Sequence, residues 1–204
     1  MTWEILNIIG IIAFALSGAM VAMEEEYDLY GVFVLGMATA FGGGVVRNIL
    51  IGIPVPSLWE QGSLLWTALV TMLVFFFLPT KVIGYWRRSE HFFDAIGLAA
   101  FAVQGALYAA QLGRPLSAIV VSAVMTGIGG GVIRDLLAGR RPMVLQEEVY
   151  AGWALAAGLC IGIGLVDTRD PVQLYGLCVT VVVLRMLSVF YKWKLPRRSL
   201  QRAA

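Results

Sequence analysis

Two arginines lie inside strongly apolar stretches, each shortly after a run of three glycines. Arg47 follows Gly42–Gly44 by three residues, and Arg134 follows Gly129–Gly131 by the same spacing. Residues three apart share a helix face, so each guanidinium should lie over its own glycines. A buried arginine is costly in a membrane unless it pairs or faces water, which makes it a candidate functional group. The alternative is that both side chains snorkel to the membrane surface.

Three consecutive glycines weaken a helix by about 3 kcal/mol relative to alanine, so another contribution must offset that loss. One explanation is close packing of the two glycine-bearing helices. The other is a bend or an unwound turn that presents backbone carbonyls to a water-filled cavity. Packing motifs space their small residues four apart, so the consecutive glycines favour the second explanation. The sequence then predicts a pore with hinges at six glycines: Gly42, Gly43, Gly44, Gly129, Gly130 and Gly131.

Further polar residues flank the two triplets. Thr39 and Thr126 precede them by three residues, so their hydroxyls either satisfy carbonyls freed by a bend or bond back within an intact helix. Plausible carboxylate partners for the arginines are Asp135, Glu60 and Glu147. We expect pore-lining or gating roles for one set of residues: Arg47, Arg134, Thr39, Thr126, Asp135 and Asn48.

The chemistry of a soluble enzyme is not expected. Neither triplet is followed by the lysine and hydroxyl residue of a P-loop, and the glycines do not form the G-x-G-x-x-G fingerprint. The single histidine, His91, cannot supply a catalytic triad or a metal-ligand set. Cys160 and Cys178 lie in apolar stretches, where cysteine acts as a small hydrophobic residue. The sequence therefore predicts no enzyme, no cofactor and no bound metal.

The triplets belong to a duplication with an offset of 87 positions, the difference between Gly129 and Gly42. The same offset relates Phe14 to Phe101. Each copy holds three apolar spans, and this odd number makes the second copy enter the membrane from the opposite face. The sequence predicts two inverted three-helix units, related by a pseudo-two-fold axis in the membrane plane, plus a seventh helix.

Composition places the chain in a membrane. Hydrophobic residues make up 59% of the sequence and charged residues 14%, with a mean hydropathy of +0.82. Soluble domains average about 45–50% apolar and about 25% charged residues. A membrane-spanning helix needs about 20 mostly apolar residues. We predict an all-α integral membrane protein with seven transmembrane helices, at 3–23, 29–50, 64–84, 92–111, 115–137, 149–166 and 172–191.

The predicted divisions are a first three-helix repeat at 4–84, an inverted second repeat at 91–166, a seventh transmembrane helix at 172–191 and a basic cytoplasmic tail at 192–204. Basic residues gather on the side of the C-terminus, so the positive-inside rule places that end in the cytoplasm and the N-terminus outside a prokaryotic plasma or inner membrane. The first span lacks a basic n-region and is expected to be retained. The basic rim suits anionic membrane lipids, and no nucleic-acid partner is expected.

Other features suggest packing or surface roles. Gly18 and Gly105 each have an alanine four residues later, which predicts helix contacts. Ser17 and Gln104 correspond to each other and should form hydrogen bonds between helices. The seventh-span Arg185 either snorkels or clamps its helix to the bundle. The acidic run 24–28 either concentrates cations near a mouth or forms a solvated turn.

The doubled motif Gly-Gly-Gly-x-x-Arg-Asn/Asp, on the second helix of each three-helix repeat and with a seventh helix after them, resembles the prokaryotic branch of the trimeric intracellular cation (TRIC) channel family. The same sequences are also classed as a bacterial family of proposed glycine transporters. The resemblance covers residues 4–190. It implies a homotrimer in which each subunit has its own pore for monovalent cations such as K⁺ and Na⁺, lined by the second and fifth helices bent at their glycine triplets.

The second helix lacks the lysine-glutamate-valine motif of animal members, so the resemblance does not extend to phosphoinositide binding or calcium-linked regulation. Arginines beside a cation path repel the ion, which favours a gate or latch over a selectivity element. The first hypothesis is therefore a potassium-permeable cation channel. The second is a secondary transporter of a small zwitterion such as glycine, whose carboxylate would meet helix dipoles and arginine. The third is a purely structural or lipid-organising protein.

Overall fold

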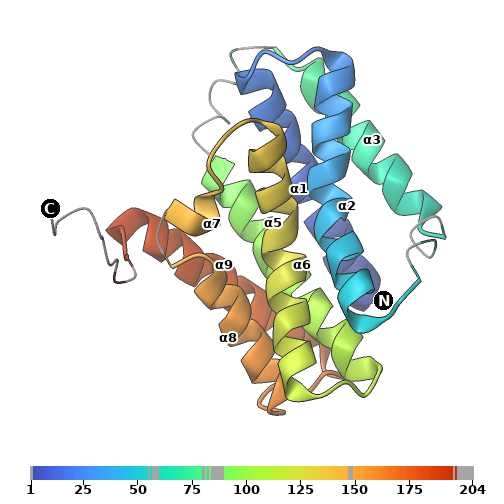
Figure 1. Cartoon of the computed structure of the whole chain (residues 1–204), viewed down its shortest axis with the longest axis vertical. Coiled ribbons are helices and arrows are strands. Elements are labelled where there is room, and N and C mark those ends of the chain that lie inside the picture. Colours follow the sequence, from blue (N-terminus) through green and yellow to red (C-terminus); the bar gives the residue numbers. More distant parts are fainter. Residues whose placement is uncertain are drawn as a thin grey trace, which may run out of the picture.

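The structure is a computed structural model that describes residues 2–54, 60–79, 90–146 and 149–194, and the isolated positions 56, 81, 83 and 196. These ranges are helical, with turns between the helices and no β-strand within them (Figure 1). The named elements are α1 (Thr2–Glu24), α2 (Leu29–Ile51), α3 (Gly62–Phe76), α5 (Glu90–Gln111), α6 (Leu116–Leu137), α7 (Met143–Gln146), α8 (Ala151–Gly162) and α9 (Pro171–Tyr191). The prediction of an all-α membrane protein is confirmed, and the predicted second and fifth spans correspond to α2 and α6.

Five of the predicted spans are helices long and apolar enough to cross a membrane: α1, α2, α5, α6 and α9. The other two, α3 and α8, are apolar but have only 15 and 12 residues. The predicted span 64–84 is interrupted, because α3 stops at Phe76, shortly before Pro79, and a residue preceding proline disfavours the helical conformation. Residues 80, 82 and 84 of that span lie outside the described residues. The predicted span 149–166 was too long. There the chain turns at Gly164, whose φ is 76°, a conformation that suits glycine.

The two halves of the chain turn in the same way at equivalent positions. Glu26 and Gly113, 87 residues apart, end α1 and α5 with φ values of 57° and 63°. Gly52 and Gly139 stand in the same relation after α2 and α6, with φ values of 78° and 70°. The left-handed conformation lets the chain leave each helix while backbone groups bond to the last carbonyls. The repeat in sequence is therefore also a repeat in local structure.

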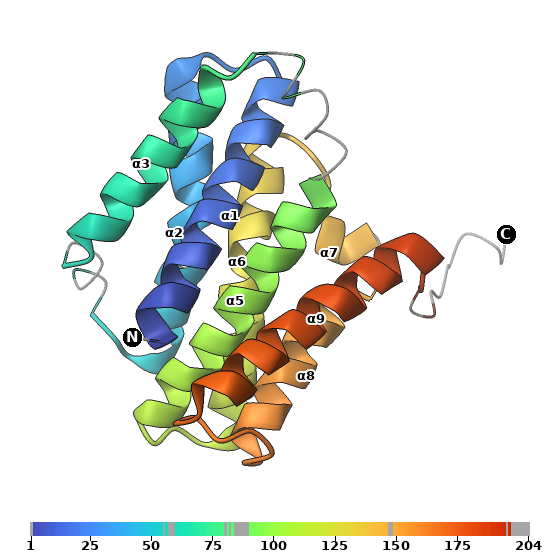
Figure 2. The ribbon, with the colours of Figure 1, turned by 180° about the vertical axis from the view of Figure 1, so that it is seen from behind.

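Corresponding helices run in opposite directions. In Figure 1, α1 rises from the N-terminus, α2 descends and α3 rises, whereas α5 descends, α6 rises and α8 descends. Figure 2 gives the same order from behind, with α9 lying obliquely across the second unit. Because Arg47 and Arg134 both lie near the ends of their helices, this inversion places them toward opposite ends of the bundle.

The centre of the bundle is formed by α1 and α5. Within their most apolar windows 72% and 78% of the residues are buried, against 28–39% for α2, α6 and α9. One apolar cluster joins α1, α2 and α3, and a second is built mainly by α5, α6, α8 and α9. The two units meet where α2 packs on α6 and α1 packs on α5.

Candidate pore at the crossing of the glycine helices

The helices α2 and α6 cross at their glycine triplets with backbone against backbone. A Cβ atom added to Gly43 would collide with the carbonyl oxygen of Thr126, and one added to Gly130 would collide with the carbonyl oxygen of Thr39. A Cβ on Gly129 would lie 2.9 Å from the Cα of Gly43. The first two contacts are the same contact seen from each copy, which is the relation that a two-fold axis produces. Only glycine permits this approach.

Both helices stay α-helical through their triplets, so the unwinding that the sequence allowed is not seen. The close contact between the helices explains why the glycines are there. The threonines support intact helices, because Thr39 Oγ1 donates to the Leu35 carbonyl at 2.6 Å and Thr126 Oγ1 donates to the Ser122 carbonyl at 2.6 Å. Close packing therefore accounts for the central glycines in this conformation, and the predicted hinge at the triplets stays a prediction.

The third glycine of each triplet faces an arginine instead. A Cβ added to Gly44 would have Arg47 Nη2 as its neighbour at 3.8 Å, and one added to Gly131 would have Arg134 Nη2 at 3.9 Å. The prediction that each guanidinium shares a face with its glycines is confirmed. Both arginines are buried, with 4% and 0% exposure, so the snorkelling alternative is wrong.

Arg134 is held by a dense set of polar partners. Its Nη1 donates to Asp94 Oδ1 at 2.9 Å and also to Ser17 Oγ, and its Nε donates to Asp135 Oδ1 at 2.8 Å. The other carboxylate oxygen of Asp94 accepts from the Tyr150 hydroxyl at 2.5 Å. One guanidinium thus faces two buried carboxylates, and the set joins α1, α5, α6 and the residue that begins α8. We call these five residues the Arg134 latch.

Arg47 has neutral partners. Its Nε and Nη2 donate to Asn48 Oδ1 at 3.0 and 2.8 Å, and its guanidinium carbon lies 4.1 Å from the centre of the Tyr108 ring. Such a cation over an aromatic face is attracted by the ring quadrupole. The ion pairs formed among the described residues do not include Arg47. Its charge therefore lacks a carboxylate counterpart in the part of the chain that the structure describes.

The partners of Arg47 and Arg134 differ because the residues at equivalent positions of the two copies differ. Asn48 corresponds to Asp135, and Asn7 corresponds to Asp94. The sequence analysis identified Asp135 as a partner and Ser17 as a contact between helices, but it missed Asp94 and Tyr150. Applying the offset to Asn7 would have pointed to Asp94, whereas Tyr150 lies outside the duplicated motifs.

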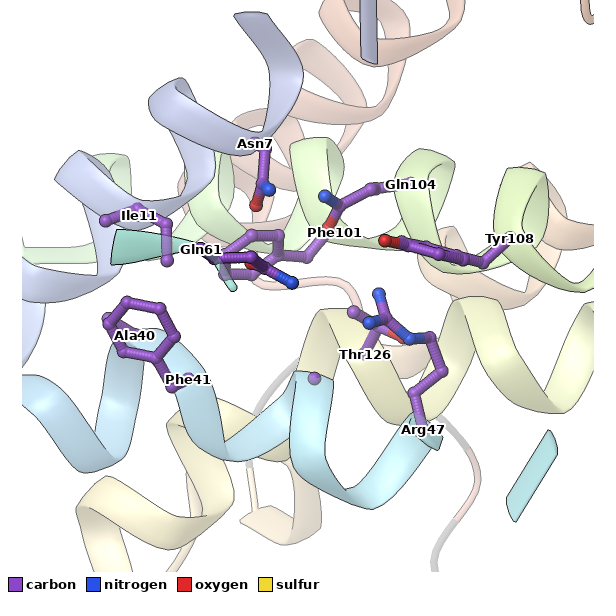
Figure 3. Close-up of a pocket in the computed structure, with 11 residues that line it drawn as sticks. Asn7, Ile11, Ala40, Phe41, Arg47, Gln61, Phe101, Gln104, Tyr108 and Thr126 are labelled. Carbon is purple, nitrogen blue, oxygen red and sulfur yellow. The ribbon is translucent and has the colours of Figure 1, made fainter. Parts of the chain in front are cut away.

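A cavity of about 20 Å³ lies beside Arg47 (Figure 3). It is lined by residues of α1, α2 and α5, with Gln61 just before α3 and Thr126 of α6 at the glycine crossing. The side chains of Asn7, Gln104, Tyr108 and Gln61 turn toward the same space as the guanidinium (Figure 3). The volume suffices for about one water molecule, and the polar lining suits one. We call this space the Arg47 chamber; it reaches the crossing from one end of the bundle.

The remaining predicted partners lie elsewhere. Arg185 is fully buried, with its guanidinium carbon 4.6 Å from the centre of the Tyr150 ring, so it clamps α9 to the bundle rather than snorkelling. Glu60 is exposed, and the ion pairs of the described arginines do not include it. Glu147 lies outside the described residues.

The acidic run after α1 is paired. Arg140 binds Glu24 at 2.9 Å and Glu25 at 2.6 Å, which ties this loop to the end of α6. Burial lowers the pKa of Arg140, but the hydrogen bonds to Glu25 and Glu24 outweigh it, so the pKa lies above its ordinary value. Glu24 and Glu25 are therefore paired, while residues 25–28 stay exposed, as the solvated-turn alternative predicts.

The chain is similar to proteins of one membrane family. A family model described as "Glycine transporter" matches residues 4–80 and 91–164. The membrane protein YvgT of Bacillus subtilis is 55% identical over 98% of both chains, and the inner membrane protein YadS of Escherichia coli K12 is 33% identical over 96% of this chain and 95% of its own.

Solved structures give the same result. A structure described as a basis for conductance through TRIC cation channels matches with a TM-score of 0.85 and 35% identity, covering 98% of each chain. A prokaryotic TRIC channel solved in 0.5 M KCl matches with a TM-score of 0.82 and 35% identity, over 95% of this chain and 98% of that one. A TRIC orthologue from Rhodobacter sphaeroides has a TM-score of 0.82 and 28% identity, over 93% and 97% of the two chains. The fold therefore recurs in proteins described as channels.

Proposed function

Because the chain belongs to the glycine transporter family and has the fold of solved TRIC cation channels, we propose that it is a membrane channel for monovalent cations, including K⁺ and Na⁺. The observation that carries the proposal is the polar Arg47 chamber. It extends from one end of an apolar bundle to the point where the glycines of α2 and α6 meet backbone against backbone. Polar residues inside a membrane bundle typically line a hydrated path.

The proposed path follows the junction between the two inverted three-helix units, 4–84 and 91–166. It passes the Arg47 chamber, the crossing at Gly43 and Gly130, and then the Arg134 latch. Conduction requires α2 and α6 to separate or bend at the crossing. At Gly43 and Gly130 their contact is made of backbone, and beside it Ile133 packs on Gly42, so a small sliding of the two helices would open the crossing.

In this proposal the residues near the crossing divide into three roles. The six glycines of the triplets act as hinges. Thr39, Thr126 and Asn48 line the path, with Arg47 in its chamber. Arg134 and Asp135 belong to a gate, because the latch closes the end of the path opposite the chamber through buried ion pairs. Breaking such pairs without replacing them is costly, so the gate favours the closed state.

The proposal extends to the assembly and its placement. The TRIC relatives support a homotrimer with one pore in each subunit, in contact with membrane lipids. Counting α3 and α8 as short spans gives seven transmembrane helices, with α9 as the seventh and 192–204 as a basic tail. The excess of basic residues toward the C-terminus supports a cytoplasmic C-terminus and an external N-terminus, and the relative in E. coli supports the inner membrane.

The test is planar-bilayer recording of the purified protein beside a variant with Gly43→Leu and Gly130→Leu. The native protein should give unitary currents that reverse at the potential set by the cation gradient. The leucines would be driven into the opposite backbone and should abolish the currents. Absence of unitary current from folded native protein in both K⁺ and Na⁺ contradicts the channel, and unchanged currents in a folded variant contradict the path.

A second candidate is a secondary transporter of glycine, favoured by the description of the matching family. The Arg47 guanidinium would then bind the carboxylate of the amino acid in a conformation whose chamber is wider than the present volume of about 20 Å³. This function predicts counterflow of labelled glycine in liposomes without unitary currents. The same purified protein serves both assays, so the two candidates are tested side by side.

A further inference from the structure

Each of the two inverted units contains a buried arginine, and the partners of the two arginines differ. At one end of the bundle, Arg134 faces Asp94 and Asp135, so its charge is more than balanced within the protein. At the other end, the equivalent positions of Asn7 and Asn48 carry amides. A buried charge without a counter-ion is strongly destabilising in a membrane, because lipid cannot solvate it. In the part of the chain that the structure describes, Arg47 therefore lacks the carboxylate partners that Arg134 has.

The Arg47 chamber offers hydrogen-bond donors around an open space. Figure 3 shows the guanidinium of Arg47, the amides of Asn7 and Gln104 and the hydroxyl of Tyr108 directed into it. Arginine can only donate, and amides and hydroxyls can donate as well as accept. Two N–H groups of Arg47 are taken up by Asn48, and the rest of the guanidinium borders the cavity. The arrangement is a set of converging donors with a positive charge.

We propose that the Arg47 chamber binds one small monovalent anion of halide size, such as chloride, which serves as the counter-ion of Arg47. The anion takes the place that the carboxylate of Asp94 occupies beside Arg134 in the other unit. Binding does not depend on whether the chain conducts cations, so the inference stands or falls separately from the proposed function.

Charge and size select this occupant. The oxygens of Asn7 and Gln104 could coordinate a cation, but the neighbouring guanidinium would repel it in a region of low dielectric constant. A cavity of about 20 Å³ holds a single water or a halide rather than an amino acid with its several non-hydrogen atoms. The bound anion would also cancel the repulsion that Arg47 otherwise exerts on a permeant cation.

The first experiment measures binding to the purified native protein in lipid nanodiscs. The melting temperature is followed while sodium chloride or sodium bromide replaces sodium gluconate at constant ionic strength. A ligand that binds the folded protein raises the melting temperature once the ligand concentration exceeds the dissociation constant of the complex. Anomalous scattering from crystals grown with bromide should place one peak in the Arg47 chamber. Equal melting temperatures in halide and gluconate, or bromide peaks only elsewhere, would overturn the proposal.

A pair of variants at Asn7 separates charge from packing. Asn7→Asp copies Asp94 of the other unit and supplies an internal carboxylate, so halide affinity should fall by about thirtyfold or more while the protein stays folded. Asn7→Leu has a similar size without a charge and removes one donor from the chamber, so it should weaken the halide response less than Asn7→Asp does. A halide response retained in Asn7→Asp, or lost equally in both variants, would contradict the counter-ion role.

A third arm distinguishes the source of the negative charge. Glycine is added in gluconate buffer, where it can supply a carboxylate without any halide. Stabilisation by glycine with no response to chloride would overturn the halide assignment. A response to chloride and bromide but not to glycine supports it, and Arg47→Gln should remove that response.

Discussion

Phe14 of α1 and Phe101 of α5 stand at equivalent positions of the two copies, and their rings meet edge to face with centroids 5.2 Å apart and planes at 71°. A residue meets its own counterpart only near a two-fold axis, so this pair marks where the axis passes. Each ring also covers a glycine of the opposite helix, because a Cβ on Gly10 would strike Phe101 and one on Gly97 would strike Phe14. The inverted units are therefore joined by matched aromatic contacts as well as by the glycine crossing.

Shortening either ring should destabilise the junction. Phe14→Ala and Phe101→Ala are each expected to cost about 3–5 kcal/mol, since large-to-small changes leave a cavity among tightly packed neighbours. Because the two rings share one contact, the double variant should deviate from additivity by about 0.5–3 kcal/mol. Thermal unfolding in detergent measures both effects. The exposed Phe77, at 71%, provides the control, and strictly additive losses at the two central rings would contradict the shared contact.

Neighbouring glycines of one triplet should respond differently to the same methyl group. Gly43→Ala places its Cβ against the Thr126 carbonyl and should cost about 1–3 kcal/mol, the usual cost of overpacking. Gly44→Ala has only the flexible end of Arg47 nearby, at 3.8 Å, and should be tolerated. Melting temperatures of the two purified variants provide the measurement. Equal tolerance of both would show that the helices do not approach as closely as the structure has them.

Much of this arrangement could be predicted because it follows from periodicity. The apolar spans gave the all-α membrane fold, and the spacing between glycine and arginine gave their shared face. The pairing of Arg134 with Asp135 was also anticipated, because the two residues are adjacent in the sequence.

The errors have physical causes that a single sequence does not contain. Whether three glycines break a helix or admit a partner depends on what packs against them, and here Gly43 and Gly130 meet backbone. From the sequence alone, Asp94 looks like an acid at the membrane surface. Its pairing with Arg134 follows only from the packing of α5 on α6. The length of α3 was missed because the apolar pattern continues past Phe76, while Pro79 ends the helix.

Weakening the Arg134 latch by one hydrogen bond should favour opening. Tyr150→Phe removes the hydroxyl that donates to Asp94 but keeps the ring beneath Arg185. A hydrogen bond to a charged group contributes about 1.5–3 kcal/mol, so the open probability in bilayer recordings should rise by about tenfold or more. Tyr30→Phe, at a side chain 76% exposed, is the matched control. An unchanged open probability in Tyr150→Phe would remove the latch from the proposed gate.

Loss of a carboxylate from the latch should affect stability more than loss of a hydroxyl. Asp94→Ala leaves Arg134 with one carboxylate in a fully buried site, and breaking a buried pair costs about 3–5 kcal/mol. Asp94→Asn reproduces the amide found at Asn7 and should be milder, because the amide oxygen can still accept from the guanidinium. The yield of folded protein and its melting temperature rank the stabilities of the native protein, Asp94→Asn and Asp94→Ala. An alanine variant as stable as the asparagine variant would contradict a structural role for this ion pair.

The pairing of Arg140 with the acidic run should contribute little and should not change between about pH 7 and about pH 10. Its pKa lies above the ordinary arginine value, so its contribution is present below that value and is lost only when the pH rises through the higher one. The cost of Arg140→Gln should therefore be the same at about pH 7 and about pH 10. The three side chains are 22–37% exposed, so that cost should not exceed about 1 kcal/mol, and salt should reduce it. Melting temperatures of the native protein and of Arg140→Gln at low and high salt measure that cost. A larger loss that salt does not reduce would mean that the loop after α1 is anchored to α6 by more than these exposed charges.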